Sequence, residues 1–266
     1  MLLGSFGPRR RGRGVKISLS VFILATNEEE DLSGAIESVG GLADEVVVVD
    51  GGSTDRTRVV AERAGARVVN RLMDNFTAQR QFALAQVRGE WVLSLDADER
   101  VSSGLAGEIR GSLGRKNCDG WLIPFKTQFM GRALRFGGAG GEKHLRLFRK
   151  DKAALVPGRG VHEEFKVPEG RTGVMAEAIL HRPYKDLGEY MSKCEFYTAL
   201  AARDFVASGK KLTWRYSLIP VYEFLRSYVF YFGFLDGLAG LVWAVLAAYH
   251  RRVRHEKIRM FLAGLR

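Results

Sequence analysis

Val46-Val47-Val48-Val49-Asp50-Gly51-Gly52-Ser53-Thr54-Asp55 is the most informative segment of this chain. Four consecutive valines predict a strand that is buried on both faces, as in a parallel sheet. The two glycines allow a tight turn or a close approach to a ligand, and Ser53, Thr54 or Asp55 can cap a following helix. Because ligands of parallel sheets bind at the carboxyl ends of strands, Asp50 is either a ligand-contacting acid or the start of an ordinary turn.

Length and composition set the broad class. The chain has 266 residues, of which 46% are hydrophobic, so it can bury a large core in one large domain or two modest ones. Its net charge of +11 favours an anionic partner: a nucleotide, a nucleic acid or an acidic membrane surface. Cys118 and Cys194 form no metal-binding spacing or disulfide framework, which fits a reducing compartment. Residues 1–14 carry four arginines without an apolar stretch, so we expect a basic tail rather than a secretory signal.

The order of predicted elements indicates an α/β fold. Helical segments separate the first four strands, as in a parallel sheet with helices on its faces. The glycine patterns of dinucleotide dehydrogenases and P-loop hydrolases are missing from the sequence, which disfavours both classes. The predicted strands cover residues 17–25, 46–50, 67–70, 91–95, 121–129, 145–148 and 163–167, with a five-glycine loop at 131–141 that could cover a substrate.

Polar residues follow two further strands. Thr26 and Asn27 come after the first strand, where Asn27 can cap a helix or line a pocket. Asp96-Ala97-Asp98-Glu99 follows the fourth strand, and an Asp-x-Asp pair can share one Mg²⁺ or Mn²⁺ ion through oxygen ligands. Such pairs are frequent by chance, but this one occupies the same place after a strand as Asp50, which favours a functional site.

Two other segments are ambiguous. Gln79 and Arg80 lie near the start of a predicted helix over 75–87, and periodicity alone favours a solvent-exposed position for both. Glu163 and Glu164 follow a glycine-rich turn and His162. A general base is one interpretation of this group, but the spacing alone favours a solvated turn.

Taken together, these residues resemble the family 2 glycosyltransferases, inverting enzymes with the GT-A fold. Within that family the chain is most similar to the lipopolysaccharide core β-glucosyltransferase (WaaE/KdtX-like) group. The resemblance covers about residues 18–182. Its general motifs are Thr26-Asn27-Glu28-Glu29, Val48 to Asp55, Gln79-Arg80 and Leu95 to Glu99, and its closer ones are Leu145 to Arg149, Val161-His162-Glu163 and His181 to Tyr184.

The resemblance implies a nucleotide-sugar donor and a divalent metal, Mg²⁺ or Mn²⁺. It also implies roles for single residues. Arg80 would approach the phosphates, contrary to the periodicity, and Glu163 would be the general base, with Glu164 as its competitor. Thr26, Asn27, Glu28, Asp50 and Ser53 would hold the nucleoside part of the donor, and Asp98 with Asp96 would bind the metal and the diphosphate.

The last third of the chain is apolar and basic. A helix is predicted over 187–206, and residues 216–249 are rich in Phe, Tyr, Leu and Val. Residues 229–249 are long enough for a membrane span, but Asp236 and three glycines speak against one. Basic residues flank the segment, so we expect a helix pair in an anionic membrane interface. A membrane span and a core or dimer-forming hairpin are the alternatives.

These observations predict a basic tail at 1–14, a GT-A domain at 15–185 and a helical extension at 186–266. The expected activity is inverting transfer of a sugar, with glucose from a UDP donor as the first choice, to a lipid-linked or lipopolysaccharide-type saccharide. The expected location is the cytoplasmic face of the inner membrane. A metal-dependent sugar nucleotidyltransferase is one alternative, although Thr26-Asn27-Glu28 is not its usual glycine-rich loop. A nucleic-acid binder is the other, but the basic residues gather at the termini and no nucleic-acid partner is expected.

Overall fold

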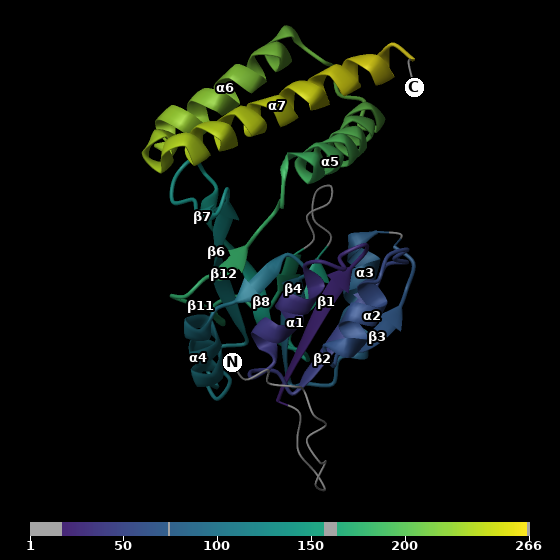
Figure 1. Cartoon of the computed structure of the whole chain (residues 1–266), viewed down its shortest axis with the longest axis vertical. Helices are drawn as coiled ribbons and strands as arrows, with labels where there is room; N and C mark the ends of the chain where they lie inside the picture. Colours follow the sequence, from purple (N-terminus) through teal and green to yellow (C-terminus); the bar gives the residue numbers. More distant parts are fainter. Residues whose placement is uncertain (1–17, 74, 157–163, 265–266) are drawn as a thin grey trace, which may run out of the picture. The chain divides into compact units, whose positions relative to one another are not determined.

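The computed structural model describes residues 18–73, 75–156 and 164–264 of the chain. The chain divides into two compact units, which Figure 1 shows in sequence colours. Unit 1 comprises residues 1–125 and 142–181, and unit 2 comprises residues 126–141 and 182–266. The chain therefore enters unit 2 twice. The domain boundaries predicted after residues 14 and 185 remain predictions.

Four parallel strands form one half of the main sheet, in the order β3-β2-β1-β4. The middle strand β1 pairs with β2 on one side and with β4 on the other, and β2 pairs with β3. Their carboxyl ends therefore lie at one edge of the sheet, where α/β proteins bind ligands. The four strands are β1 (Leu19–Ala25), β2 (Glu45–Asp50), β3 (Arg67–Asn70) and β4 (Trp91–Asp96).

Beyond β4 the sheet is mixed and continues in the order β8-β6-β12-β5. Antiparallel pairs join β4 to β8 and β12 to β5, while β11 and β7 pair with β6. The strands not predicted from the sequence are β5, β7, β9, β11 and β12. The bounds are β5 (Glu99–Val101), β6 (Gly120–Phe129), β7 (Arg132–Ala133), β8 (Gly140–Arg149), β11 (Thr172–Val174) and β12 (Ile179–His181), with a separate antiparallel pair of β9 (Ala154–Val156) and β10 (Glu164–Lys166).

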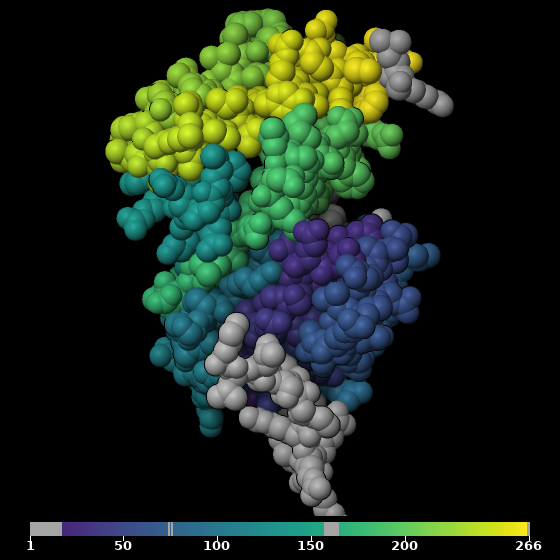
Figure 2. Space-filling view, viewed as in Figure 1, coloured from purple at the N-terminus to yellow at the C-terminus, as the bar shows by residue number. Residues whose placement is uncertain are grey.

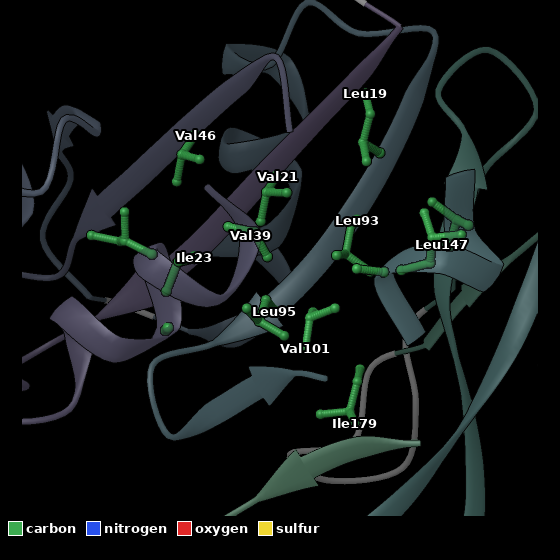
Figure 3. Packing of buried hydrophobic residues seen from close by; sticks show 14 of the residues in the cluster. Leu19, Val21, Ile23, Val39, Val46, Leu93, Leu95, Val101, Leu147 and Ile179 are labelled. Atoms are coloured by element: carbon green, nitrogen blue, oxygen red, sulfur yellow. The ribbon is translucent and has the colours of Figure 1, made fainter. Parts of the chain in front are cut away.

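The valine run of β2 contributes to two hydrophobic cores on opposite faces of the sheet. Val46 and Val48 belong to the larger core, which Figure 3 shows between strands and helices. Val47 and Val49 belong to the smaller one. Because side chains of a strand alternate between its faces, four consecutive apolar residues are required where both faces are covered. The prediction of a strand buried on both faces is confirmed.

Helices cover both faces of this sheet. The larger core receives Leu32, Ala61 and Leu105 from three helices, and the smaller core receives Ala83 from a fourth. Gln79 in that fourth helix is buried and donates to the carbonyl oxygen of Arg71 at 2.8 Å, so its predicted exposure is wrong. The helices are α1 (Leu32–Val39), α2 (Thr57–Arg63), α4 (Ser103–Ser112) and α3 (Phe76–Gln86).

Unit 2 is mainly helical. Its long helix α7 packs against both α5 and α6, and the Tyr190 hydroxyl of α5 donates to the carbonyl oxygen of Leu246 at 2.6 Å. The elements are α5 (Leu187–Ala207), the 3₁₀ turn η1 (Trp214–Leu218), α6 (Ile219–Leu225), the π-helical turn η2 (Arg226–Phe230), the 3₁₀ turn η3 (Gly233–Asp236) and α7 (Gly237–Leu262).

The glycine-rich segment 126–141 belongs to this helical unit. Asp236 accepts hydrogen bonds from the backbone N–H groups of Arg135 and Phe136 at 3.0 and 2.9 Å. The Ser227 hydroxyl donates to the carbonyl oxygen of Gly137 at 2.7 Å. The ends of the predicted loop are strands β7 and β8, and its middle is fixed by these bonds. The predicted fold class, an α/β sheet flanked by helices with a helical C-terminal extension, is confirmed.

Candidate active site

The ends of β1, β2 and β4 bring the predicted site residues to one edge of the sheet. Ala25, the last residue of β1, pairs with Asp50 of β2, and Leu24 pairs with Asp96 of β4. Neighbouring strands lie about 4.8 Å apart, so the backbones of Asp50 and Asp96 are separated by about 10 Å, with β1 between them.

The loops that follow β1 and β2 are hydrogen bonded to each other. The Asn27 backbone N–H donates to the Ser53 hydroxyl at 2.9 Å, and the Thr54 N–H donates to the Asn27 side-chain oxygen at 2.9 Å. The Glu28 N–H donates to the Thr57 hydroxyl at 2.7 Å. Asn27 therefore does not cap a helix, since α1 begins only at Leu32. Its left-handed backbone, with φ of 57°, turns its side chain into this loop pair.

A close backbone approach fixes the position of Asp50. A Cβ atom on Gly51 would lie 2.0 Å from the Thr26 hydroxyl oxygen, so only glycine fits between the two loops. Asp50 is buried, and its carboxylate accepts a hydrogen bond from the Ser53 backbone N–H at 3.2 Å. Thr26, Asn27, Glu28, Asp50 and Ser53 are thus neighbours, as a shared site for one ligand requires.

Two arginines converge on Asp96 at the end of β4. Arg146, from β8, donates through Nη2 to Asp96 at 2.9 Å and to Glu99 at 2.6 Å. Arg80, from α3, lies with Nη2 at 3.6 Å from the Asp96 carboxylate and donates through Nη1 to the Ser94 hydroxyl at 3.1 Å. The exposed position that periodicity favours for Arg80 is therefore wrong. Its side chain lies at the end of β4, and the role at the phosphates that the resemblance implies stays a prediction.

Burial and the neighbouring charges shift the pKa values of Asp96 and Glu99 in opposite directions. Burial, together with the negative charges of Asp96 and Asp98, raises the pKa of Glu99 to about 8 in spite of Arg146. Burial alone would also raise the pKa of Asp96, but the guanidinium groups of Arg146 and Arg80 hold it well below its usual range. Asp96 is consequently the ionised acid of the pair, and Glu99 is the acid that holds a proton more readily.

The second acid of the Asp-x-Asp pair has a different partner. The Asp98 carboxylate lies 3.4 Å from Nε2 of His181. Burial lowers the pKa of His181, but the hydrogen bond and negative charge of Asp98 outweigh this and raise the pKa above its usual value. The antiparallel pairing of β12 with β5, in register His181 to Glu99, delivers the imidazole to this place. Sequence reasoning used His181 only as a family marker and missed this position.

Both arginines keep unused donors. Within the described part of the chain, Nε of Arg80 and Nη1 of Arg146 are buried without a hydrogen-bond partner. Buried guanidinium N–H groups are costly to leave unpaired, and they match phosphate oxygens well. The arginine pair beside Asp96 therefore has the chemistry to receive an anionic ligand.

The predicted general base and the predicted metal site are less well defined in the structure. Glu163, the predicted base, lies outside the described residues, and Glu164 is the first residue of β10. The described residues contain no group of three or more His, Cys, Asp or Glu side chains arranged to hold a metal ion. Asp98 and His181 are nevertheless a carboxylate and an imidazole at close range, and both are ligand types that Mn²⁺ accepts.

Two glycosyltransferases of known sequence are similar to this chain over most of its length. The lipopolysaccharide core biosynthesis glycosyltransferase LpsC of Rhizobium meliloti is 33% identical over 90% of this chain and 94% of its own length. An uncharacterized glycosyltransferase of Rickettsia conorii is 31% identical over 91% of this chain and 89% of its own length.

Among solved structures, glucosyl-3-phosphoglycerate synthase from Mycobacterium tuberculosis with Mn²⁺ and UDP-glucose covers 74% of this chain and 81% of its own. Its identity of 19% and TM-score of 0.47 are too low to assign a ligand or an activity. The family profile described as glycosyl transferase family 2 matches residues 20–161, more than half of the chain. That match agrees with the GT-A fold class predicted from the sequence. The chain therefore belongs to glycosyl transferase family 2, and it is a glycosyltransferase.

Proposed function

We propose that this enzyme transfers a sugar, with inversion, from a nucleotide-sugar donor to a lipid-linked or lipopolysaccharide-type saccharide. The observation that carries the proposal is the cluster at the end of β4. Asp96 and Asp98 lie there with Arg80, Arg146 and His181, at the edge of the sheet where β1 and β2 also end. Carboxylates and guanidinium groups together suit a metal-bound diphosphate.

The loops after β1 and β2 are the proposed nucleoside site. Thr26, Asn27, Glu28, Asp50 and Ser53 would hold the base and ribose of a UDP donor. Their mutual hydrogen bonds support this role, because a preformed loop pair binds a ligand without first paying an ordering cost.

The diphosphate would lie beside β4. Asp98 and His181, with Asp96, would hold Mg²⁺ or Mn²⁺, and phosphate oxygens would complete the coordination because few protein ligands are present. When bound, the metal neutralises charge that develops on the leaving diphosphate. Arg80 and Arg146 would offer their unused N–H groups to the same oxygens.

In the transfer step a carboxylate removes the proton of the acceptor hydroxyl. The hydroxyl oxygen forms a bond to the anomeric carbon while the bond from that carbon to the diphosphate breaks on the opposite face. A single displacement of this kind inverts the configuration and releases a nucleoside diphosphate. Glu163 is the proposed base, with Glu164 as the competitor.

A relative and the composition of the chain support the proposed acceptor and location. The name of the LpsC relative, which assigns it to lipopolysaccharide core biosynthesis, supports a lipopolysaccharide-type acceptor. Glucose is the first donor sugar to test because the sequence motifs resemble the β-glucosyltransferase group. Such an acceptor is held in a membrane, and the apolar helix α7 supports a peripheral or monotopic place at the cytoplasmic face of the inner membrane. Family membership decides against the nucleotidyltransferase and nucleic-acid-binding alternatives.

The test uses the full chain, Mn²⁺, UDP-glucose and lipopolysaccharide acceptors that lack outer sugars. We expect release of UDP, not pyrophosphate, and a β-linked product. Asp98→Asn should lower kcat at least 100-fold. Asp151→Asn, which changes a well-exposed acid in the same unit, should leave kcat unchanged. Full activity of Asp98→Asn in saturating metal would contradict the proposed role.

A further inference from the structure

Exposed apolar side chains gather in one part of unit 2. Soluble proteins rarely expose large contiguous apolar patches unless the patch is an interaction site. This part of the chain runs from α6 through η2 and η3 to the start of α7. Its ten exposed members are Val221, Tyr222, Leu225, Val229, Phe230, Tyr231, Phe232, Phe234, Leu235 and Leu238.

The exposed residues of α6 and the turns beside it lie on one helical face. Leu218, Tyr222, Leu225 and Val229 follow each other at spacings of three or four residues, which keeps them on one side of a helix. Glu223 lies on the other side, where it is buried and lines a pocket of about 280 Å³ among α5, α6 and α7.

The same division holds for α7. Leu238, Val245 and Tyr249 are exposed at spacings of seven and four residues and so share one face. Trp243, Ala247 and other residues on the far side of the helix line the pocket. Both exposed stripes therefore turn away from the pocket. Together they are called the outer apolar face, made of Leu218, Val221, Tyr222, Leu225, Val229, Leu238, Val245 and Tyr249. Figure 2 shows the lime and yellow atoms of α6 and α7 adjoining along unit 2.

The inner side of the helix pair is closely fitted within unit 2. A Cβ atom on Gly240 of α7 would lie 1.9 Å from the carbonyl oxygen of Gly233, so the backbones of α7 and the turn η3 touch. The buried Ser227 hydroxyl is bonded to the carbonyl oxygen of Gly137. Because these contacts fix the rotation of the helices, the apolar stripes cannot turn inward without breaking them.

The charges around this face are complementary to an anionic surface. Unit 2 contains 17 Lys and Arg against 7 Asp and Glu, a formal net charge of +10 out of +11 for the chain. Five of its acids are occupied internally. Glu223 pairs with Arg226 and Arg251, and Asp236 accepts hydrogen bonds from backbone N–H groups. The other three, Glu189, Glu195 and Glu256, each pair with a Lys or Arg of the same unit. Basic side chains beside apolar and aromatic ones are the composition of helices that lie in membrane interfaces.

The length of the apolar part argues against a membrane span. The described chain has one helical segment apolar and long enough to be considered, residues 233–262. Between Gly237 and Tyr249 no charged side chain occurs, a rise of roughly 20 Å at 1.5 Å per residue, against a hydrocarbon core of about 30 Å. Arg251, Arg252 and Arg254 follow at once. A helix pair lying along the surface keeps these arginines at the headgroups without a span shorter than the hydrocarbon core.

We infer that the outer apolar face of α6 and α7 docks parallel to the surface of an anionic lipid bilayer. This inference rests on the proposed function, since a membrane-held acceptor gives the docking its purpose. The apolar stripes would enter the boundary between headgroups and acyl chains. Arg252 and Arg259 both pair with Glu256, but their side chains are 60% and 62% exposed, so their outward N–H groups would meet lipid phosphates. A second copy of the chain fits the same face less well, because a two-fold pair would bring like-charged arginines together.

The test is flotation of the full chain with vesicles of phosphatidylcholine alone or with about one-third phosphatidylglycerol. We expect at least tenfold stronger binding to the anionic vesicles. The variant Leu225→Gln/Val229→Gln/Val245→Gln should lose at least tenfold. The matched control Val59→Gln/Val174→Gln changes exposed valines of unit 1 and should bind like the parent chain. Circular dichroism and thermal unfolding check that both variants are folded.

The depth to which the helix pair enters the bilayer is measured by the fluorescence of Trp214, which is 71% exposed and lies four residues before Leu218. Brominated acyl chains should quench the parent chain, and Trp214→Phe should lose that quenching. Failure to bind anionic vesicles, or unchanged binding of the triple variant, would overturn the inference. So would a dimer in ultracentrifugation that the triple variant dissociates, since the face would then join two copies.

The proposed function is read out separately as release of UDP with a soluble saccharide acceptor. The triple variant should keep this activity, because its substitutions lie outside unit 1. Absence of UDP release in the parent chain would count against the proposed function, whatever the vesicles show.

Discussion

At the residue scale, the two acids of the Asp-x-Asp pair differ in what holds them. Asp96 is bound by guanidinium groups, which compete with a metal ion for its oxygens. Asp98 is bound by the imidazole of His181, whose pKa it raises. Unlike a guanidinium group, the imidazole can release its proton and then bind the metal itself. We therefore expect Asp98 and His181 to dominate metal binding, and Asp96 to orient the arginines toward the diphosphate.

Replacing His181 tests this division. His181→Gln should weaken the apparent Mn²⁺ affinity at least tenfold, because an imidazole ligand is lost. His144→Gln is the matched control, since both histidine rings pack edge-on against Phe125 at 5.2 and 5.9 Å. The measurement is a Mn²⁺ titration of UDP release. If both substitutions weaken the apparent Mn²⁺ affinity equally, His181 acts only by packing against Phe125 and is not a metal ligand.

A second residue-scale prediction concerns acid stability. Hydrogen bonds from Arg171 hold the pKa of the buried Asp119 below its usual range. A lowered pKa means that Asp119 stabilises the fold above about pH 4, and that this contribution is lost as the pH falls. Asp119→Asn should reduce the free energy of unfolding at pH 7 by about 1.5–3 kcal/mol.

Urea unfolding between pH 7 and pH 3.5 measures this effect. The gap between Asp119→Asn and the parent chain should narrow below pH 4, as the parent carboxylate takes up its proton. The control Asp151→Asn should show no gap at any pH, because Asp151 is well exposed. A gap that stays constant with pH would mean that charge is not its cause.

At the element scale, the turns after β1 and β2 behave as one piece. Their contact at Gly51 leaves no room for a side chain beside Thr26. Gly51→Ala should therefore cost about 1–3 kcal/mol of stability and weaken donor binding. Gly107→Ala, in α4 with open space around the new methyl group, should instead gain about 0.4–1 kcal/mol.

Chemical denaturation gives the stabilities, and titration with UDP gives the affinity. Adding Thr26→Ala to Gly51→Ala removes the clashing hydroxyl and should recover part of the lost stability. If the double variant is no more stable than Gly51→Ala, the contact does not explain the glycine.

The parts of the site that could be predicted from sequence are those encoded locally. The valine run and Asp96-Ala97-Asp98 reveal strands and their ends within a few residues, because burial on two faces needs consecutive apolar residues. The places of Arg146 and His181 beside these acids depend on β8 and β12, which pair with β4 and β5 across long stretches of chain. Periodicity misplaced Arg80 because its partners, Ser94 and Asp96, belong to another element.

The wrong expectations have the same origin. Asparagine is a residue type preferred at helix N-caps, but the Asn27 side chain bonds instead to Thr54, 27 residues further along the chain. Gln79 is polar, and only its bond to the Arg71 backbone makes its burial tolerable. Neither partner is visible in a local pattern.

At the scale of the whole molecule, charge is divided unequally. Unit 2 carries +10 and unit 1 only +1, although residues 1–17 of unit 1 hold five Lys and Arg. The unit with the proposed nucleotide site is therefore nearly neutral, and the attraction to anionic surfaces belongs to the helical unit.

This division predicts how salt affects activity. Raising ionic strength from about 0.05 to 0.5 M shortens the screening length severalfold. We expect KM for an acceptor in anionic vesicles to rise severalfold and KM for a soluble acceptor to change little. Parallel assays of UDP release with the two acceptors measure this. An equal rise for both would place the salt effect at the donor site.

The double entry of the chain into unit 2 has a practical consequence for genetics and protein engineering. A stop codon after residue 185 looks like a clean removal of an accessory tail. It would in fact take Asp236 and Ser227 away from the hairpin at 126–141, whose N–H and C=O groups they bind. The shortened enzyme would lose activity because the hairpin at 126–141 has lost these hydrogen-bond partners, even if membrane binding were not needed. The phenotype of a truncation therefore cannot by itself be attributed to membrane targeting.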